Sequence, residues 1–254
     1  MDKEYYTKYY LYERNHWWFK VRESILKEKI NNLINTGNNI RILNVGVATG
    51  RTTEWLTQYG KVTSVEYDKD CCDFLKTQLN MEVINASVTN LPFEHNLFDM
   101  VCAFDVIEHV DDDQKAVNEM IRVCKENGTV FITVPAFMNL WSSHDDINHH
   151  KRRYAIHELK KLFKNKHGQI TSTYFNTLLF LPIYLIRKIL NLFADLRKDD
   201  KKQSDFALLD NKLTSSIFYR IFLLEKYLLR LIKFPFGISV LLTFKKNNAC
   251  YKIK

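Results

Sequence analysis

Glycine, proline and cysteine are all scarce in this chain of 254 residues. Seven Gly and four Pro are too few for the many tight turns of an all-β sandwich, so the composition favours a helix-rich fold. The five Cys are odd in number and form no C-x-x-C pair, which gives no sign of a disulfide framework or a cysteine metal site. The hydrophobic fraction of 46% excludes a disordered chain and fits one large domain, or one domain with a cap.

Long apolar runs are also missing. The first twenty residues are polar and aromatic and lack the apolar segment of a signal peptide, so we expect a cytoplasmic protein. An apolar stretch at residues 178–186 stops at Arg187. That stretch is too short to cross a bilayer, which takes about 20 apolar residues.

Charge is divided unevenly along the chain. Residues 1–150 contain 15 Lys and Arg against 22 Asp and Glu, whereas residues 151–254 contain 22 against 7. The net charges are therefore −7 and +15. This asymmetry predicts a basic surface with an acidic partner, either nucleic acid, anionic lipid or a phosphorylated substrate. Nucleic acid is the least favoured, because no binding motif is present and the basic residues are mixed with apolar runs.

Short apolar strands alternate with helices between residues 40 and 135. This alternation predicts an α/β fold, a Rossmann-like doubly wound and mostly parallel sheet whose ligands bind at the carboxyl ends of the strands. One helix is expected to begin among the acids at 111–113 and to end at Gly128. The predicted organisation is an N-terminal helical lid, a core, an amphipathic helical insert, and a final core strand with a tail, at residues 1–36, 37–173, 174–234 and 235–254.

A glycine-containing turn follows the first expected strand in "ILNVGVATGRTTEWL". Gly46 permits a sharp turn and close approach of a ligand, and Gly50 permits close packing where the next helix begins. Glu66 ends the following strand, at the position where an acid holds the two ribose hydroxyls of an adenosine group. A hydride-transferring dinucleotide enzyme fits less well, because the position of its third glycine is Thr53.

Four motifs in order resemble the class I S-adenosylmethionine (SAM)-dependent methyltransferases: "NVGVATG", "SVEYD", "SVTNLPF" and "FDMVCAFDVIEHVDD". The opening "HWWFKVR" resembles a type 11/23-like bacterial subgroup of the same family. The resemblance implies SAM as cofactor, with Glu66 on the ribose, Ser87 near the adenine and Asp105 near the sulfonium. The implied cofactor-binding residues are Asn44, Gly46, Val47, Ala48, Gly50, Glu66, Tyr67, Ser87, Val88, Phe104 and Asp105.

Three of these positions depart from the family pattern. Asn44 stands where the family has an acid and brings no negative charge to the ligand's ammonium. The missing charge-assisted hydrogen bond is worth roughly 1.5–3 kcal/mol. Ala48 replaces a glycine, which is tolerable unless that residue needs a positive φ. Ser87 replaces an aspartate. An alternative therefore stays open: a catalytically degenerate protein of the same fold that binds SAM or its product, or serves as a scaffold.

Histidines dominate the candidate catalytic residues. His109 follows the fourth strand and is a candidate base for the proton of an acceptor hydroxyl, although a structural bond to Glu108 is an equal alternative. The loop "SHDDINHHKRRY" offers a second candidate, with Asp145 orienting one of the two histidines His144 and His150. The histidines and acids of this loop match no named zinc spacing, so we expect no metal site.

Candidate substrate-binding residues come from both ends of the predicted core. The same loop supplies two arginines that could clamp a phosphate or carboxylate, and the lid supplies a histidine and an arginine. The full set is His16, Arg22, Arg152, Arg153 and Tyr154. A solvated loop and an aromatic helix packed on the sheet are the structural alternatives for these residues.

The insert predicts a helix with a basic stripe. Lys226, Arg230 and Lys233 share one side, and leucines at 223, 224, 228 and 231 face away from it. The stripe suits contact with an anionic membrane, packing on the chain's own core, or an oligomer interface. We expect methyl transfer to the oxygen or nitrogen of a small or lipid-linked acceptor, with the inner membrane face as a second, peripheral location.

Overall fold

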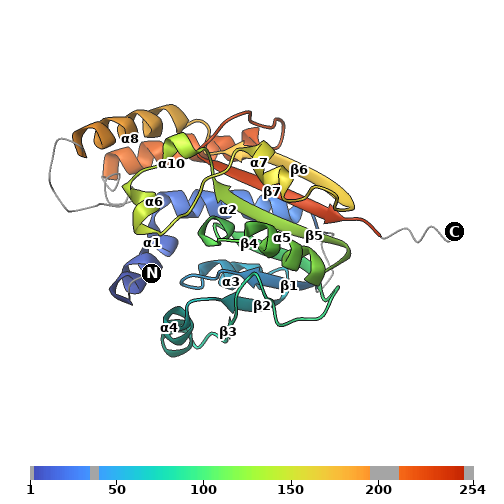
Figure 1. Ribbon diagram of the computed structural model, residues 1–254. Coiled ribbons are helices and arrows are strands. Elements are labelled where there is room, and N and C mark those ends of the chain that lie inside the picture. Colours follow the sequence, from blue (N-terminus) through green and yellow to red (C-terminus); the bar gives the residue numbers. More distant parts are fainter. Residues whose placement is uncertain (1–2, 35–39, 195–211, 249–254) are drawn as a thin grey trace.

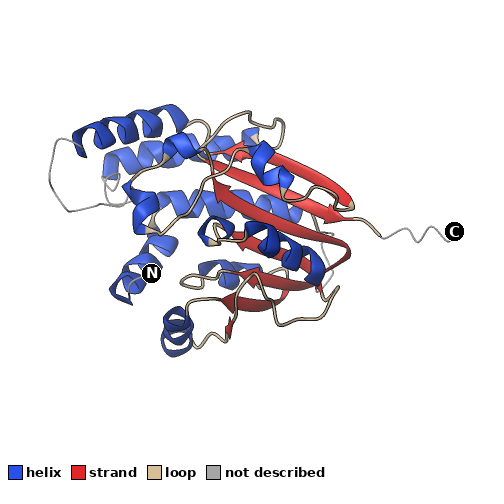
Figure 2. Cartoon of the chain, viewed as in Figure 1, coloured by secondary structure: helices blue, strands red, loops and turns tan. Residues whose placement is uncertain are grey.

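A seven-stranded sheet runs through the computed structural model, which describes residues 3–34, 40–194 and 212–248 (Figures 1 and 2). The strand order is β3-β2-β1-β4-β5-β7-β6, and β7 runs in the direction opposite to the other six strands. The predicted Rossmann-like, mostly parallel sheet is therefore confirmed. The strands are β1 (Ile40–Val45), β2 (Gly60–Glu66), β3 (Ile84–Asn85), β4 (Phe98–Phe104), β5 (Cys124–Pro135), β6 (Gly168–Phe175) and β7 (Ser239–Lys246).

Helices cover both faces of the sheet (Figure 2). Figure 1 shows α5 and α7 on the near face, with α2 and α10 behind the sheet. No helix in the described part of the chain is both long and apolar enough to cross a membrane. The helices are α1 (Lys3–Asn15), α2 (Trp17–Asn31), α3 (Arg51–Leu56), α4 (Lys69–Leu79), α5 (Asp113–Val123), α6 (Ser143–Ile147), α7 (Ile156–Lys161), α8 (Phe180–Ala194) and α10 (Lys212–Leu228), with 3₁₀ turns η1 (Ile107–His109) and η2 (Met138–Leu140).

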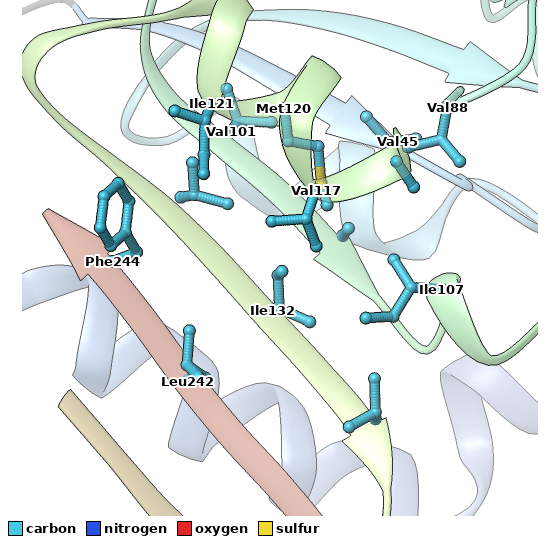
Figure 3. Close-up of a cluster of buried hydrophobic side chains, with 14 of the residues drawn as sticks. Val45, Val88, Val101, Ile107, Val117, Met120, Ile121, Ile132, Leu242 and Phe244 are labelled. Carbon is cyan, nitrogen blue, oxygen red and sulfur yellow. The ribbon is translucent and has the colours of Figure 1, made fainter. Parts of the chain in front are cut away.

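Alternate residues of the central strands feed two separate cores. In β4, Val101 belongs to the core beneath α5, which also holds Val117 and Ile132 (Figure 3). Its neighbour Met100 belongs to the opposite core, beneath α2 and α10. Because a strand's side chains alternate between faces, a strand buried on both faces must be apolar throughout. This explains why the central strands appear in the sequence as continuous apolar runs.

The predicted N-terminal helical lid consists of two helices, α1 and α2. The chain leaves helical geometry at His16, whose ψ is 136°, and the His16 Nδ1 accepts a hydrogen bond from the Trp18 backbone amide. His16 thus caps α2, as a side-chain acceptor at this position is able to do. The predicted boundary at residue 36 and the charged linker after residue 194 lie outside the described residues.

The prediction that Gly128 ends a helix is wrong. Helix α5 ends at Val123, and β5 begins at once with Cys124, which pairs with Phe98 of β4. A Cβ on Gly128 would lie 2.9 Å from the Asp99 carbonyl oxygen. The glycine is therefore required by close strand packing inside β5, not by a left-handed helix terminus.

The helices of the insert pack on the chain's own core. Phe222 and Leu229 are buried against α2 and the sheet. The Glu225 carboxylate accepts hydrogen bonds from the backbone amides of Thr177 (2.7 Å) and Leu178 (2.9 Å), which fixes α10 to the end of β6.

Two residues of the predicted basic stripe face α2. Arg230 forms an ion pair with Glu28 of α2, and the Lys226 Nζ lies 3.8 Å from the same carboxylate. Helix α10 ends at Leu228, so Lys233 lies beyond it. Lys226 and Arg230 share this one carboxylate of α2, which fits packing of the stripe on the chain's own core, one of the three alternatives that the sequence left open.

Candidate active site

The turn after β1 requires backbone conformations that favour glycine. Gly46 has a φ of +70°, and a Cβ there would lie 2.4 Å from a methyl carbon of Val106. Gly50 has a φ of +88° and packs closely against Leu75. Ala48 also has a positive φ, +46°. Because glycine adopts a positive φ without strain and alanine does not, alanine at this position costs about 1 kcal/mol of stability.

Glu66 ends β2 with its carboxylate held by three backbone amides. The Ala48 amide donates to one oxygen at 3.2 Å, and the Tyr67 and Asp68 amides donate to the other at 2.9 and 3.1 Å. Burial raises the pKa of Glu66, and these hydrogen bonds act in the opposite direction. The carboxylate is thus fixed in place before any ligand arrives.

A single cavity of about 1080 Å³ joins this turn to the carboxyl ends of β2 and β4. Its volume lies at the upper end of the roughly 300–1,000 Å³ typical of ligand pockets, which leaves room for a cofactor and an acceptor together. Nine of the eleven predicted cofactor-binding residues line it: Gly46, Val47, Ala48, Glu66, Tyr67, Ser87, Val88, Phe104 and Asp105.

Asn44 and Gly50 are not among the residues that line this cavity. Asn44 is 1% exposed, and its Nδ2 donates to the Thr53 hydroxyl at 2.9 Å. Its Oδ1 has no hydrogen-bond partner within the part of the chain that the structure describes. The predicted contact of Asn44 with a ligand's ammonium does not fit this placement, because the side chain serves the packing of α3 against β1.

Arg22 of α2 reaches across the cavity wall to the end of β4. One of its terminal nitrogens donates to the Asp105 carboxylate at 2.6 Å and to the Thr133 hydroxyl at 3.1 Å. Asp105 has a φ of +58°, an uncommon conformation for a residue other than glycine. The ion pair therefore ties the N-terminal helices to the strand end where the resemblance places the reacting sulfonium.

Glu13 is a second acid of the cavity that the sequence analysis missed. It lies on α1, is 7% exposed and accepts a hydrogen bond from the Thr49 hydroxyl in the turn after β1. Burial raises the pKa of Glu13 to about 7, against the hydrogen bond from Thr49 and the charges of Arg14 and Arg22. No motif marks Glu13, because only the docking of α1 places it here.

Asp145 is the buried centre of the second predicted cluster. Its Oδ1 lies 2.7 Å from the His150 Nδ1 and accepts a 2.7 Å hydrogen bond from the Arg153 Nε. Burial alone would raise the pKa of Asp145, but His150 and Arg153 hold it well below its usual range. Arg153 is 3% exposed and also donates to the Ala136 carbonyl oxygen. The arrangement matches the predicted histidine with an orienting carboxylate.

His109 and His150 lie next to each other, with ring centroids 4.7 Å apart. Burial, together with the charge of His150, lowers the pKa of His109 to about 4, which keeps its imidazole neutral. Beside them, burial and the nearby Asp105 raise the pKa of Glu108 well above its usual range. His144 lines the same cavity, so all four predicted catalytic residues lie in one region.

The predicted substrate-binding residues are divided. Three of them line the cavity: His16, Arg22 and Arg153. Arg152 and Tyr154 do not, because both bond Asp113 at the start of α5, at 2.9 and 2.8 Å respectively. Of the two arginines predicted to clamp a substrate, only Arg153 therefore lies at the cavity. Asn176 and Arg187, which the sequence analysis did not select, are both buried and line the cavity.

A cavity at the carboxyl ends of the parallel strands is where α/β proteins of this doubly wound type bind their ligands. Residues 43–132 match the family model described as "Methyltransferase domain". Within these residues the chain is similar to the class I SAM-dependent methyltransferases.

Two curated proteins resemble part of the chain. A norajmaline N-methyltransferase of Rauvolfia serpentina is 34% identical over 76 residues, which are 30% of this chain and 25% of that protein. A probable SAM-dependent methyltransferase of Mycobacterium tuberculosis is 30% identical over 76 residues, 30% of this chain and 28% of that protein. The chain thus spans about a quarter of the length of these relatives.

Solved structures match nearly the whole chain at low identity. A chain from the complex between the Trm112 methyltransferase activator and a methyltransferase of Haloferax volcanii aligns with a TM-score of 0.59 and 12% identity, covering 96% of this chain and 97% of that one. A SAM-dependent methyltransferase of Archaeoglobus fulgidus aligns with a TM-score of 0.55 and 16% identity, covering 94% and 99%. At such identities the likeness establishes the fold.

Proposed function

We propose that this protein transfers a methyl group from SAM to an oxygen or nitrogen of an acceptor held in the same cavity. The observation that carries the proposal is the single cavity that contains both the fixed Glu66 carboxylate and the histidine region. In the reaction the sulfonium–methyl bond breaks, the acceptor atom bonds the methyl group, and S-adenosylhomocysteine leaves. An acceptor hydroxyl also loses its proton, which a neutral imidazole such as His109 is able to take.

Charge in the cavity supports a cationic cofactor. Glu66 is suited to the ribose hydroxyls. Glu13, which bonds Thr49 in the turn after β1, supplies a carboxylate close to the part of the pocket where Asn44 leaves the family's acid missing. We assign the ammonium of the cofactor to Glu13 on this ground, and the sulfonium to the neighbourhood of Asp105.

The experiment is calorimetric titration of the purified protein with SAM and with S-adenosylhomocysteine. The native chain should bind both at micromolar concentration, and Glu66→Ala should weaken binding at least tenfold. Glu82→Ala is the matched control, because Glu82 is an exposed acid that does not line the cavity. Absence of binding to the folded native chain would overturn the proposal and favour the scaffold alternative.

A lipid-linked acceptor is the finer part of the proposal, with the protein peripheral on the inner membrane face. Leu181, Leu185 and Ile189 are 62%, 49% and 52% exposed and follow one another at four-residue spacing along α8. Three residues of the same helix, Ile183, Ile186 and Arg187, line the cavity. An acyl or isoprenoid chain lying on the exposed stripe would therefore present its polar end to the site.

Co-sedimentation with vesicles tests this part. Vesicles with about one third anionic lipid should pellet the native protein at low salt, and the double variant Leu181→Gln, Leu185→Gln should stay in the supernatant. Leu11→Gln is the control, since Leu11 is 53% exposed on α1. If the native protein does not pellet, the membrane contact is wrong. A second copy as occupant of the stripe would appear instead as a dimer that the double variant abolishes.

A further inference from the structure

Glu108, His109 and His150 come together from two loops at the carboxyl edge of the sheet. Glu108 and His109 form the turn η1 after β4, and His150 follows α6 in the long loop after β5. One ligand-type atom from each residue lies within 4.8 Å of the other two. All three residues line the cavity. Because 41 residues separate His109 from His150, no local spacing reveals the group.

The Glu108 carboxyl group is the first sign that something belongs between these residues. Glu108 is 0% exposed. Neither carboxyl oxygen has a hydrogen-bond partner on any residue that the structure describes. Leaving a buried carboxyl group without partners costs several kcal/mol if it is charged, and about 1–3 kcal/mol if it is neutral. A bound cation would satisfy both oxygens.

His150 is held as a metal-binding histidine is, and His109 lies beside it. The His150 Nδ1 faces the Asp145 carboxylate at 2.7 Å. A carboxylate only accepts hydrogen bonds, so Nδ1 carries the hydrogen and Nε2 keeps its lone pair. The His109 ring packs against the His150 ring, with ring centroids 4.7 Å apart. Metal-binding histidines almost always use their second nitrogen to donate to a carboxylate or a backbone carbonyl.

We propose that Glu108, His109 and His150 bind a divalent first-row transition cation such as Zn²⁺ or Mn²⁺. Such cations bind a set of two imidazoles and one carboxylate more tightly than the hard cations Mg²⁺ and Ca²⁺ do. Bond lengths of about 2.0–2.2 Å bring ligand atoms to about 3 Å from one another. Small side-chain rotations achieve this contraction. The remaining coordination positions face the cavity. The histidine spacing in the loop after β5 gave no sign of a metal, because two of the three ligands lie outside that loop.

The site also narrows the acceptor, and this consequence rests on the proposed function. A cation beside Asp105 would bind an acceptor hydroxyl and lower its pKa, so that the proton leaves to solvent before methyl transfer. The cation would then replace His109 as the cause of deprotonation. A second oxygen next to the hydroxyl, as in a vicinal diol or a catechol-like ring, would fill another coordination position. The site therefore favours an oxygen acceptor over a nitrogen acceptor.

Direct metal titration tests the site without an acceptor. Protein stripped with a chelator is titrated with Co²⁺, whose visible absorption reports its ligands, and with Zn²⁺ in competition with a chromogenic chelator. The native chain should bind one equivalent of each metal at micromolar or tighter affinity. Mg²⁺ should not displace Co²⁺ at equal concentration. Thermal melting should move upward with bound metal.

Two variants and two controls identify the ligands. Glu108→Gln and His150→Asn should each weaken Zn²⁺ binding at least tenfold, consistent with the loss of one ligand. Glu13→Gln changes another buried acid of the cavity, and His144→Asn changes another cavity histidine, so both should keep native metal affinity. Far-ultraviolet circular dichroism checks that each variant is folded.

Either of two results overturns the inference. One is a native chain that binds no equivalent of Co²⁺ or Zn²⁺, a result that needs no variant. The other is a pair of folded ligand variants that bind as tightly as the native chain, which would assign the metal to surface histidines. SAM titration of the same samples keeps the two proposals separate. SAM binding that depends on Glu66 in a chain without metal affinity would refute the metal site alone.

Discussion

The ion pair between Arg22 and Asp105 offers the sharpest test of how the N-terminal helices are held over the cavity. The Arg22 side chain is 9% exposed and that of Asp105 is 33% exposed. Arg22→Met keeps most of the side-chain volume and removes the charge, whereas Asp105→Asn keeps a hydrogen-bond acceptor for Thr133. A double-mutant cycle with these two substitutions isolates the energy of the pair from the energy of packing.

The expected magnitude follows from burial. A charge-assisted hydrogen bond to a buried partner contributes roughly 1.5–3 kcal/mol. Two features reduce this figure: the partial exposure of Asp105, and the Arg22 Nε, which lacks a hydrogen-bond partner among the described residues. We therefore expect Arg22→Met to lower the free energy of unfolding by about 2 kcal/mol, with a coupling energy of about 1.5 kcal/mol. For a chain of this size the melting temperature falls by roughly 4–8 °C.

Urea denaturation at neutral pH measures both quantities, and hydrogen exchange of α2 reports whether the helix loosens locally. The matched control is Arg51→Met, which removes a bridge between α3 and Glu23 of the same α2. The Arg51 side chain is 35% exposed, and such pairs contribute about 0.5 kcal/mol. Equal losses in Arg22→Met and Arg51→Met, or a coupling energy below about 0.5 kcal/mol, would refute the reasoning.

Three further predictions concern backbone strain and buried acids. Ala48→Gly should raise the free energy of unfolding by about 1 kcal/mol because it relieves a positive φ, whereas Ala116→Gly inside α5 should lower it by at least about 1 kcal/mol. Burial raises the pKa of Glu225 to about 7, so its contribution to stability is fully present below about pH 4.5 and is lost as the pH rises through 7. Denaturation at pH 5 and pH 8 should therefore show a smaller loss for Glu225→Gln than for the native chain. The pKa of Glu13, raised to about 7, predicts proton release when cationic SAM binds at pH 7. The binding enthalpy should then vary with the buffer, except in Glu13→Gln.

Much of the fold was predictable because local patterns dictate it. The central strands are buried on both faces, so they appear as apolar runs in the sequence. The turn after β1 needs a residue that tolerates a positive φ, and glycine at position 46 marks it. The helix boundaries were less predictable. The helical pattern continues through His16, and only the capping contact with Trp18 shows that the chain turns there. Gly128 looks like a helix terminus in sequence, yet the packing of two strands requires it.

Site residues were predictable from the sequence where they stand at the end of a predicted strand. Glu66 and Asp105 end β2 and β4, so a parallel sheet places both at the same edge. The partners of Arg22, Arg152 and Glu13 were not predictable. Arg22 and Asp105 are 83 positions apart in sequence, and Arg152 turns to α5 instead of the cavity. Such pairings depend on how helices dock, which no local spacing encodes.

The charges around the cavity give these separate features a common explanation. Glu13, Glu66 and Glu108 bring three carboxyl groups to its walls, and Arg22 and Arg153 are buried guanidinium groups that already pair with Asp105 and Asp145. The raised pKa values of Glu13, Glu66 and Glu108 are the expected result of burying acids without enough positive charge nearby. A cationic sulfonium cofactor would reduce this imbalance near Glu13 and Glu66, and a divalent cation would reduce it at Glu108. The neutral amide of Asn44 then need not weaken the site, because α1 brings a carboxylate to the same turn from another part of the chain.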